Sequence, residues 1–189
     1  RAIQTIFHLA AEAIVSRALN NPEKTLDSNV RGTWVVLEAA RKFKITEVVI
    51  ASSDKAYGMH KKLPYKENYA LQGKYPYECS KSCADLISQM YAETYGVPVV
   101  IARCGNIYGG GDMNESRLIP DALKSIIQKK PFVVRSNGKF LRDYIYITDI
   151  VEAYIALAEK LHSKKLSGKA FNFANNHPLS VIEVLKILQ

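Results

Sequence analysis

Hydrophobic residues along the chain gather in short unbroken runs, separated by longer segments in which they recur every three or four positions. The unbroken runs read as buried strands at residues 5–11, 47–53, 97–103 and 170–174. Strands that are buried on both faces are typical of parallel sheets, because helices cover both sides of such a sheet. The runs therefore predict an α/β protein built on a parallel sheet.

The segments between the runs have the period of one apolar helix face. They predict helices over residues 12–20, 23–43, 77–95, 116–129 and 149–161, and a further helix after Ser180. Asn20-Asn21-Pro22 separates the first two of these helices, since proline is accepted at a helix start but not inside a helix. Helices between successive strands supply the crossovers that parallel strands require.

Composition limits the number of domains and the kinds of partner. With 189 residues, 48% of them hydrophobic, the chain can form one sizeable core but not two ordinary α/β domains. The net charge of +8 indicates an anionic partner such as nucleic acid, an anionic membrane or a phosphorylated small molecule. Basic residues occur as scattered pairs such as Lys61-Lys62 and Lys129-Lys130, which favours solvated loops over a nucleic-acid-binding stripe. A non-catalytic basic nucleotide- or nucleic-acid-binding domain is kept as an alternative.

The cysteines and the hydropathy profile bear on location. Cys79, Cys83 and Cys104 lack the spacing of metal ligands, so we expect no metal site, and a reducing, cytoplasmic compartment. No basic and then apolar leader opens the chain, and no apolar run approaches the roughly 18 residues of a membrane span. We therefore expect neither a signal peptide nor a membrane partner.

Candidate chemistry lies between the second predicted strand and the helix that follows it. Tyr77 and Lys81 are four residues apart, so on a helix the ammonium lies one turn from the phenol on the same face. A neighbouring cation lowers the tyrosine pKa from about 10 and allows Tyr77 to act as a base. Ser53 ends the strand at residues 47–53, at the edge where open α/β sheets place ligands, and its hydroxyl can bind the same substrate oxygen.

Residues 52–58, with Tyr77 and Lys81, resemble the extended short-chain dehydrogenase/reductase superfamily, in its branch of nucleotide-sugar epimerases and dehydratases. The stretches at residues 7–11 and 29–33 are similar to the same superfamily. The resemblance implies bound NAD and a catalytic set formed by Ser53, Tyr77 and Lys81. It also implies a group of cofactor-binding residues, namely Ala10, Ala11, Asn29 and Ser52, with Tyr77 and Lys81.

The fold implied by this resemblance is a partial Rossmann-like, doubly wound parallel sheet with a small C-terminal substrate-binding part. No Gly-x-Gly-x-x-Gly turn is present, so we expect the first strands and the glycine-rich phosphate-binding loop upstream of residue 1. Residues 1–110 are then the C-terminal half of the NAD-binding domain with the catalytic residues. Residues 111–189 are mainly the substrate-binding part, truncated at its end, with some elements returning to the core.

Two later stretches indicate a nucleotide-sugar site. The sequence at residues 103–112, followed by 117–121, resembles the CDP-glucose 4,6-dehydratase branch. In that branch the segment leads to the sugar nucleotide, and Asn106 and Arg117 can hydrogen-bond phosphate or base oxygens. Arg142 lies in a stretch resembling one whose arginine grips the nucleotide diphosphate, a role that suits a bidentate guanidinium. A surface ion pair between Arg142 and Asp143 is the alternative.

Asp54 and Lys55, directly after Ser53, decide between two enzyme classes. Both classes first oxidise the C4 hydroxyl of the sugar, but loss of water across C5 and C6 needs a further base and a further acid. The resemblance assigns Asp54 as the acid, with Lys55 as the base or as the group that fixes the charge; a solvated turn pair is the alternative. We therefore predict a nucleotide-sugar 4,6-dehydratase, which returns hydride to C6, with a 4-epimerase as the alternative.

The resemblance also implies partners. The substrate is a nucleoside diphosphate hexose, and neither nucleic acid nor membrane is expected. A homodimer is implied through a four-helix bundle made from the Tyr77 helix and the helix before it.

Overall fold

The computed structural model describes residues 3–134 and 136–189. The chain forms two compact units. The first comprises the chain up to Cys104 together with Val151–Phe173, and the second comprises Gly105–Ile150 and Ala174–Gln189. The chain therefore leaves the first unit at Cys104 and returns to it for one helix and one strand. Among the described residues, no helix is both long enough and apolar enough to traverse a membrane.

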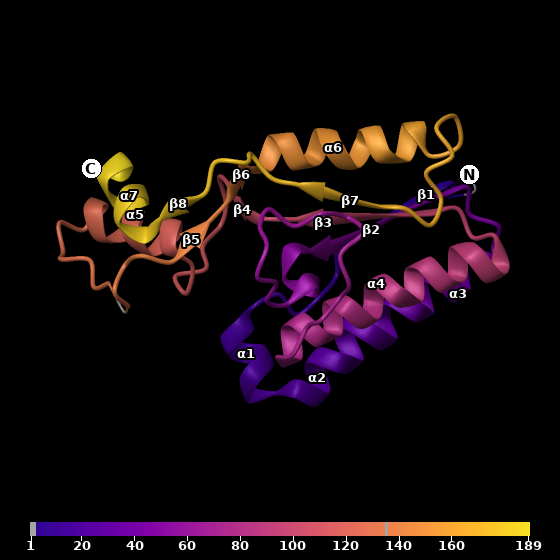
Figure 1. The fold of residues 1–189 in the computed structure, drawn as a ribbon, viewed down its shortest axis with the longest axis horizontal. Helices are drawn as coiled ribbons and strands as arrows, with labels where there is room; N and C mark the ends of the chain where they lie inside the picture. The colour runs from indigo at the N-terminus through magenta and orange to yellow at the C-terminus, as the bar shows by residue number, and fades with distance from the viewer. Residues whose placement is uncertain (1–2, 135) are drawn as a thin grey trace. The chain divides into compact units, whose positions relative to one another are not determined.

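The first unit is built on a parallel sheet with the strand order β1-β2-β3-β7 (Figure 1). Its strands are β1 (Thr5–His8), β2 (Glu47–Ser53), β3 (Val99–Cys104) and β7 (Ala170–Phe173). Every residue of β3 is buried, as expected of a central strand covered on both faces. The parallel α/β sheet predicted from the hydrophobic runs is confirmed, although β1 ends at His8 and not at residue 11.

Helices cover both faces of this sheet. In Figure 1, α3 (Gly32–Lys42) and α4 (Pro76–Tyr95) lie on one face, and α6 (Ile147–Lys160) lies on the other. Leu37 of α3 packs with Val48 of β2 and Ile101 of β3 in the hydrophobic core. The sheet is therefore doubly wound, as the helical crossovers predict.

The crossover from β1 to β2 differs from the single long helix that the sequence predicts over residues 23–43. It consists of α1 (Val15–Asn20), α2 (Pro22–Leu26), a π-helical turn η1 (Asp27–Arg31) and then α3. The Asn21 side chain accepts from the Lys24 backbone N–H and so caps α2. A π-helical turn inserts extra backbone and often marks a functional position, and here it contains the buried Asn29.

The connection from β2 to α4 begins with a 3-10 turn, η2 (Asp54–Tyr57), and continues as a loop to Tyr75. Glu78 accepts from the backbone N–H groups of Lys74 and Tyr75 at the start of α4. Gly96 ends α4 with φ 66°, a left-handed conformation that glycine adopts without steric cost. Both ends of α4 are therefore fixed by local contacts.

Among its described residues, the second unit contains two small sheets, two helices of its own and the first turn of α6. Strand β4 (Asn106–Tyr108) pairs in parallel with β6 (Tyr144–Tyr146), and β5 (Leu141–Arg142) pairs antiparallel with β8 (Leu179–Ser180). The helices are α5 (Leu118–Ile127) and α7 (Val181–Leu188). Strands of two or three residues leave no hydrophobic period in the sequence, which is why the sequence did not predict them.

Candidate functional site

Ser53 ends β2 at the carboxyl edge of the sheet and caps the 3-10 turn. Its Oγ accepts from the Lys55 backbone N–H at 3.2 Å and donates to Asp54 Oδ1 at 3.1 Å. Ser53 is buried, and the strand register sets it beside Cys104 of β3. The turn therefore fixes the direction of the hydroxyl at the edge where ligands bind in open α/β sheets.

Lys81 of α4 reaches the tip of the same strand. Its Nζ donates to the carbonyl oxygen of Ala51 at 2.8 Å, and only 7% of the residue is exposed. Burial disfavours the charged form and lowers the pKa of Lys81 to about 8, while the nearby Cys104 thiol acts in the opposite direction. The buried ammonium of Lys81 is thus bonded to the edge of the sheet two residues before Ser53.

Tyr77 lies in the first turn of α4, one turn before Lys81, and is half-buried. Since both residues belong to one regular helix, they share a face, as their spacing predicts. Tyr154 of α6 lies at the same end of the sheet, with its Oη 3.5 Å from Cys104 Sγ. Burial raises the pKa of Tyr154, and the neighbouring Cys104 and Tyr77 add to this shift. Tyr77, Lys81 and Ser53 therefore all belong to the first unit, and Lys81 docks on the strand that carries Ser53.

Asp54 and Lys55 form an ion pair within the 3-10 turn. Lys55 Nζ lies 2.9 Å from Oδ1 and 2.8 Å from Oδ2 of Asp54. Both side chains are partly exposed, so a ligand at the strand tip could reach them. An acid and an amine in direct contact can exchange a proton. The same contact also fits the alternative in which Asp54 and Lys55 are only an ion pair on a solvated turn.

Asn29 holds the loop after β1 against α4. Its Oδ1 accepts from the Glu12 backbone N–H at 2.7 Å, and its Nδ2 donates to Glu12 O at 3.0 Å and to Ser80 Oγ at 2.8 Å. Ser80 in turn donates to the carbonyl oxygen of Tyr77 at 2.7 Å. Asn29 therefore fixes the backbone near the predicted cofactor residues and near Tyr77.

The same loop carries Ala10, which is exposed, and Ala11, which is half-buried. Small side chains directly after a parallel strand leave the backbone open to a nucleotide that crosses the carboxyl edge of the sheet. The loop, together with the buried Lys81 ammonium, therefore fits a dinucleotide. Ser52, also predicted as a cofactor residue, donates its hydroxyl to Asp85 Oδ2 at 3.1 Å inside the helix–sheet interface.

The three predicted substrate residues belong to the second unit. Asn106 Nδ2 donates to Asp143 O at 3.1 Å, and Arg117 pairs with Asp112 at 2.9 Å. Arg142 is exposed, and its Nη1 donates to the adjacent Leu141 O at 2.8 Å. The Asp143 carboxylate accepts from the backbone N–H groups of Asn175 and His177.

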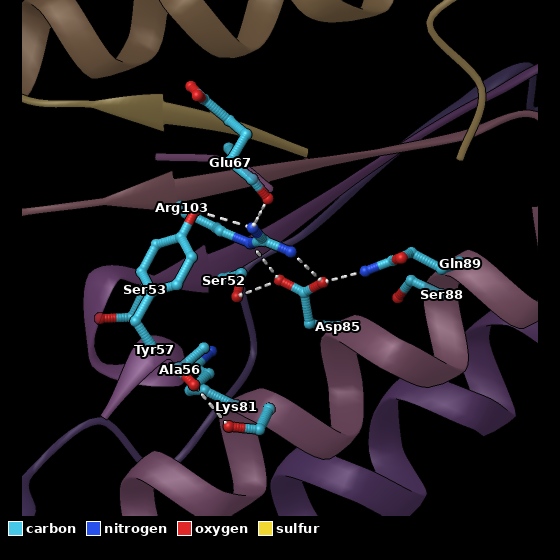
Figure 2. Close-up of polar contacts among 12 residues, drawn as sticks. Ser52, Ser53, Ala56, Tyr57, Glu67, Lys81, Asp85, Ser88, Gln89 and Arg103 are labelled. Carbon is cyan, nitrogen blue, oxygen red and sulfur yellow. Dashed lines mark hydrogen bonds and ion pairs between the residues drawn. The ribbon is translucent and has the colours of Figure 1, made fainter. Parts of the chain in front are cut away.

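The sequence prediction missed a buried polar group formed by Tyr57, Asp85 and Arg103 (Figure 2). Arg103 interrupts an otherwise apolar strand, and Asp85 lies on the buried face of α4. Charged residues are almost never fully buried unless they are paired. A charge within a core pattern was therefore the signal that could have identified this group.

Comparison with known proteins identifies the family of the chain. Residues 1–174 match the model of the NAD dependent epimerase/dehydratase family. The chain is similar to the CDP-glucose 4,6-dehydratase of Salmonella typhimurium, with 32% identity over an alignment of 172 residues that covers 85% of this chain and 48% of that protein. The chain spans about half the length of the curated relatives it matches.

Two solved structures share the fold. A double mutant of the dTDP-glucose 4,6-dehydratase DesIV from Streptomyces venezuelae, with NAD and DAU bound, has a TM-score of 0.90 and 26% identity, covering 100% of this chain and 57% of that one. UDP-glucose 4-epimerase from Thermotoga maritima, with UDP-glucose, has a TM-score of 0.90 and 25% identity, covering 98% and 60%. Because the family model matches most of the chain, this protein belongs to the NAD dependent epimerase/dehydratase family.

Proposed function

We propose that the protein is an NAD-dependent nucleotide-sugar 4,6-dehydratase that acts on a nucleoside diphosphate hexose. The observation that carries the proposal is the docking of Lys81 on Ala51, which brings α4 to the strand tip that bears Ser53 and the Asp54–Lys55 pair. Similarity to a CDP-glucose 4,6-dehydratase supports the choice of reaction. The free cysteines suit a reducing compartment, so we also propose a cytoplasmic location.

The first step oxidises the C4 hydroxyl. Ser53 orients this hydroxyl, and Tyr77 removes its proton because the Lys81 ammonium stabilises the phenolate. Bound NAD would supply a hydride acceptor for C4 and later a hydride donor for C6. Ala10, Ala11, Asn29 and Ser52, with Tyr77 and Lys81, would hold the cofactor. Asn29 would do so through the loop that it fixes, and Ser52 through the strand tip that its bond to Asp85 fixes.

Loss of water uses the Asp54–Lys55 pair. Transfer of one proton from Lys55 to Asp54 across their 2.8 Å contact gives a carboxylic acid beside a neutral amine. Lys55 then takes the C5 proton, which the C4 ketone has acidified, while Asp54 gives its proton to the departing 6-hydroxyl. A C5–C6 double bond forms and water leaves. Lys55 returns the proton to C5 when C6 is reduced, and the proton that Tyr77 took from the C4 hydroxyl restores the Asp54–Lys55 ion pair.

The second unit would bind the nucleotide part of the substrate. Arg142 is exposed, and a guanidinium matches the geometry of a diphosphate. Arg117 and Asn106 would contact phosphate or base oxygens. We propose that the first unit binds the cofactor and that the second unit binds the sugar nucleotide.

A homodimer through a four-helix bundle of α3 and α4 is part of the proposal. Large apolar side chains on these helices are exposed, with Trp34 at 50%, Leu86 at 55% and Met90 at 41%. Exposed apolar groups along neighbouring helices favour association with a second copy. Sedimentation of the protein with Leu86→Glu should show monomers where the wild type forms dimers; an unchanged dimer would exclude this surface.

The test of function is a product assay on the full-length protein with CDP-, dTDP- and UDP-hexoses. A 4-keto-6-deoxy sugar is expected from one of them. Asp54→Asn should stop water loss, since an amide cannot donate the required proton, but should leave oxidation at C4 possible. A 4-epimer as the only product would support the second candidate, which the similarity to the Thermotoga maritima 4-epimerase favours.

A further inference from the structure

Arg103 of β3 is buried in the first unit, where it joins elements that carry the candidate catalytic groups. We infer that Arg103, acting with Asp85 and Tyr57, is a positioning residue: it holds α4, the tip of β2 and the 3-10 turn in one arrangement. This inference deepens the proposed dehydratase function and rests on it.

The centre of this arrangement is a bidentate ion pair. Arg103 Nε lies 2.8 Å from Asp85 Oδ2, and Nη2 lies 2.9 Å from Oδ1. Arg103 is 3% exposed and Asp85 is fully buried. A planar guanidinium that meets a carboxylate through two parallel bonds fixes direction as well as distance. The pair therefore orients α4 against β3.

Asp85 connects this pair to the strand tip. Besides Arg103, the carboxylate accepts from Ser52 Oγ at 3.1 Å and from Gln89 Nε2 at 2.7 Å (Figure 2). Ser52 directly precedes Ser53, and Asp85 is one helical turn after Lys81. Ser52, the neighbour of the candidate hydroxyl, is thus bonded to a carboxylate that lies one turn from the candidate ammonium.

The other side of Arg103 connects to the 3-10 turn. Nη1 donates to Tyr57 Oη at 2.7 Å and to Glu67 O at 3.0 Å, and the guanidinium carbon lies 4.8 Å from the centre of the Tyr57 ring. Tyr57 is the last residue of the turn that contains Asp54 and Lys55. The position of the turn is therefore set by the same guanidinium.

The loop at residues 59–75 is attached through the same residues. Tyr65 stacks on Tyr57 with ring centres 4.9 Å apart, and Tyr57 Oη donates to Asn172 Oδ1 at 2.7 Å. Asn172 Nδ2 donates to Tyr65 O, and its backbone N–H donates to Glu67 Oε1, both at 3.0 Å. Loss of the Tyr57 hydroxyl should therefore loosen this loop as well as the turn.

A stabilising role alone would not require this chemistry, since well-packed apolar residues often replace a buried ion pair without loss of stability. What such residues cannot supply is several directed bonds from one rigid group. Catalysis depends on that direction, because a displacement of about 1 Å at a reacting group can lower turnover by around 100-fold.

Tyr57→Phe and Tyr91→Phe form a matched pair of variants for the test. Each removes one hydroxyl; that of Tyr91 donates to Glu38 Oε2 of α3 at 3.3 Å. With full-length protein, we expect Tyr57→Phe to lower kcat about 10-fold with KM within twofold. Trypsin should cut this variant several-fold faster at Lys61 and Lys62, whereas Tyr91→Phe should match the wild type in both measurements. Wild-type kcat and wild-type cleavage in Tyr57→Phe would overturn the inference.

Arg103→Lys supplies a second measurement, because lysine keeps the positive charge but cannot make the two parallel bonds of the guanidinium. If α4 shifts against β2, Lys81 Nζ loses the Ala51 oxygen that holds it in place. The ammonium then stabilises the Tyr77 phenolate less, so the acid limb of the kcat profile should move to higher pH. A loss of folded protein without any such shift in the soluble fraction would assign Arg103 a structural role only. Cleavage by trypsin needs no nucleotide sugar. If no nucleotide sugar is turned over, the proposed function fails. The rates at which trypsin cuts Tyr57→Phe and Tyr91→Phe still decide whether the network holds the loop.

Discussion

The candidate residues of the two units are held in different ways. In the first unit, Lys81 and Asn29 are buried and bonded to elements far away in sequence, at Ala51, Glu12 and Ser80. In the second unit, Arg117 and Arg142 are exposed and bonded to Asp112 and to Leu141 O. Groups that move protons need fixed positions, whereas groups that hold a flexible diphosphate can adjust to it.

Lys81→Met should have the largest effect on this comparison. Methionine fills a similar volume but supplies no ammonium, so the Tyr77 phenolate loses its stabilisation. We expect kcat to fall about 1,000-fold with a small change in KM, within the range found for a positioned acid–base group. Steady-state kinetics would measure it, with Lys42→Met, at an exposed lysine on α3, as the control. A KM effect of the same size would place Lys81 in binding and not in chemistry.

Arg142→Gln should change KM more than kcat, the reverse of Lys81→Met. If the guanidinium holds the diphosphate in both the ground state and the transition state, KM should rise about 10-fold to 30-fold while kcat changes little. Titration with the nucleoside diphosphate alone should show the same loss. Arg31→Gln, at a surface ion pair with Asp27 in the first unit, is the control. A fall in kcat at unchanged KM would contradict a binding role.

The pH dependence should separate stability from activity at Lys81. Its pKa is lowered to about 8, whereas an unfolded lysine holds its proton to about pH 10.4. The unfolded state therefore binds more protons between these values, and the contribution of Lys81 to stability rises with pH across that window. We expect wild type to gain about 2 kcal/mol relative to Lys81→Met between pH 7.5 and 9.5. Turnover, which uses the charged form, should fall over the same range.

Denaturant unfolding at the two pH values would measure this gain. If wild type and Lys81→Met change in parallel, the ammonium is not buried in solution as it is in the structure. If turnover rises together with stability, the neutral amine and not the ammonium is the active form.

Arg117→Gln should have the smallest effect. Its pair with Asp112 is on the surface, and exposed ion pairs contribute little to stability. The free energy of unfolding should change by less than about 0.5 kcal/mol, as measured in denaturant at low and at moderate salt. A loss several times larger would mean that the second unit also relies on fixed polar contacts, and the contrast between the units would not hold.

Much of the first unit could be predicted from the sequence. The strand at residues 47–53 was predicted with the bounds that β2 has, and α4 begins at Pro76, one residue before the predicted start. The helical period alone was enough to predict that Tyr77 and Lys81 share one face of α4. Short elements were harder: η2, β4 and β6 contain three or four residues each, which is too few to set a hydrophobic period.

The sequence by itself determined what depends on neighbours within about one helical turn. This includes the alternation of strands and helices, the serine at a strand end and the tyrosine one turn before a lysine. The tertiary structure alone decided which distant residues meet: Lys81 with Ala51, Asn29 with Ser80, and Arg103 with Asp85 and Tyr57. Such pairs follow from strand register and helix packing, because burial forces each polar group to find a partner wherever the fold brings one within reach.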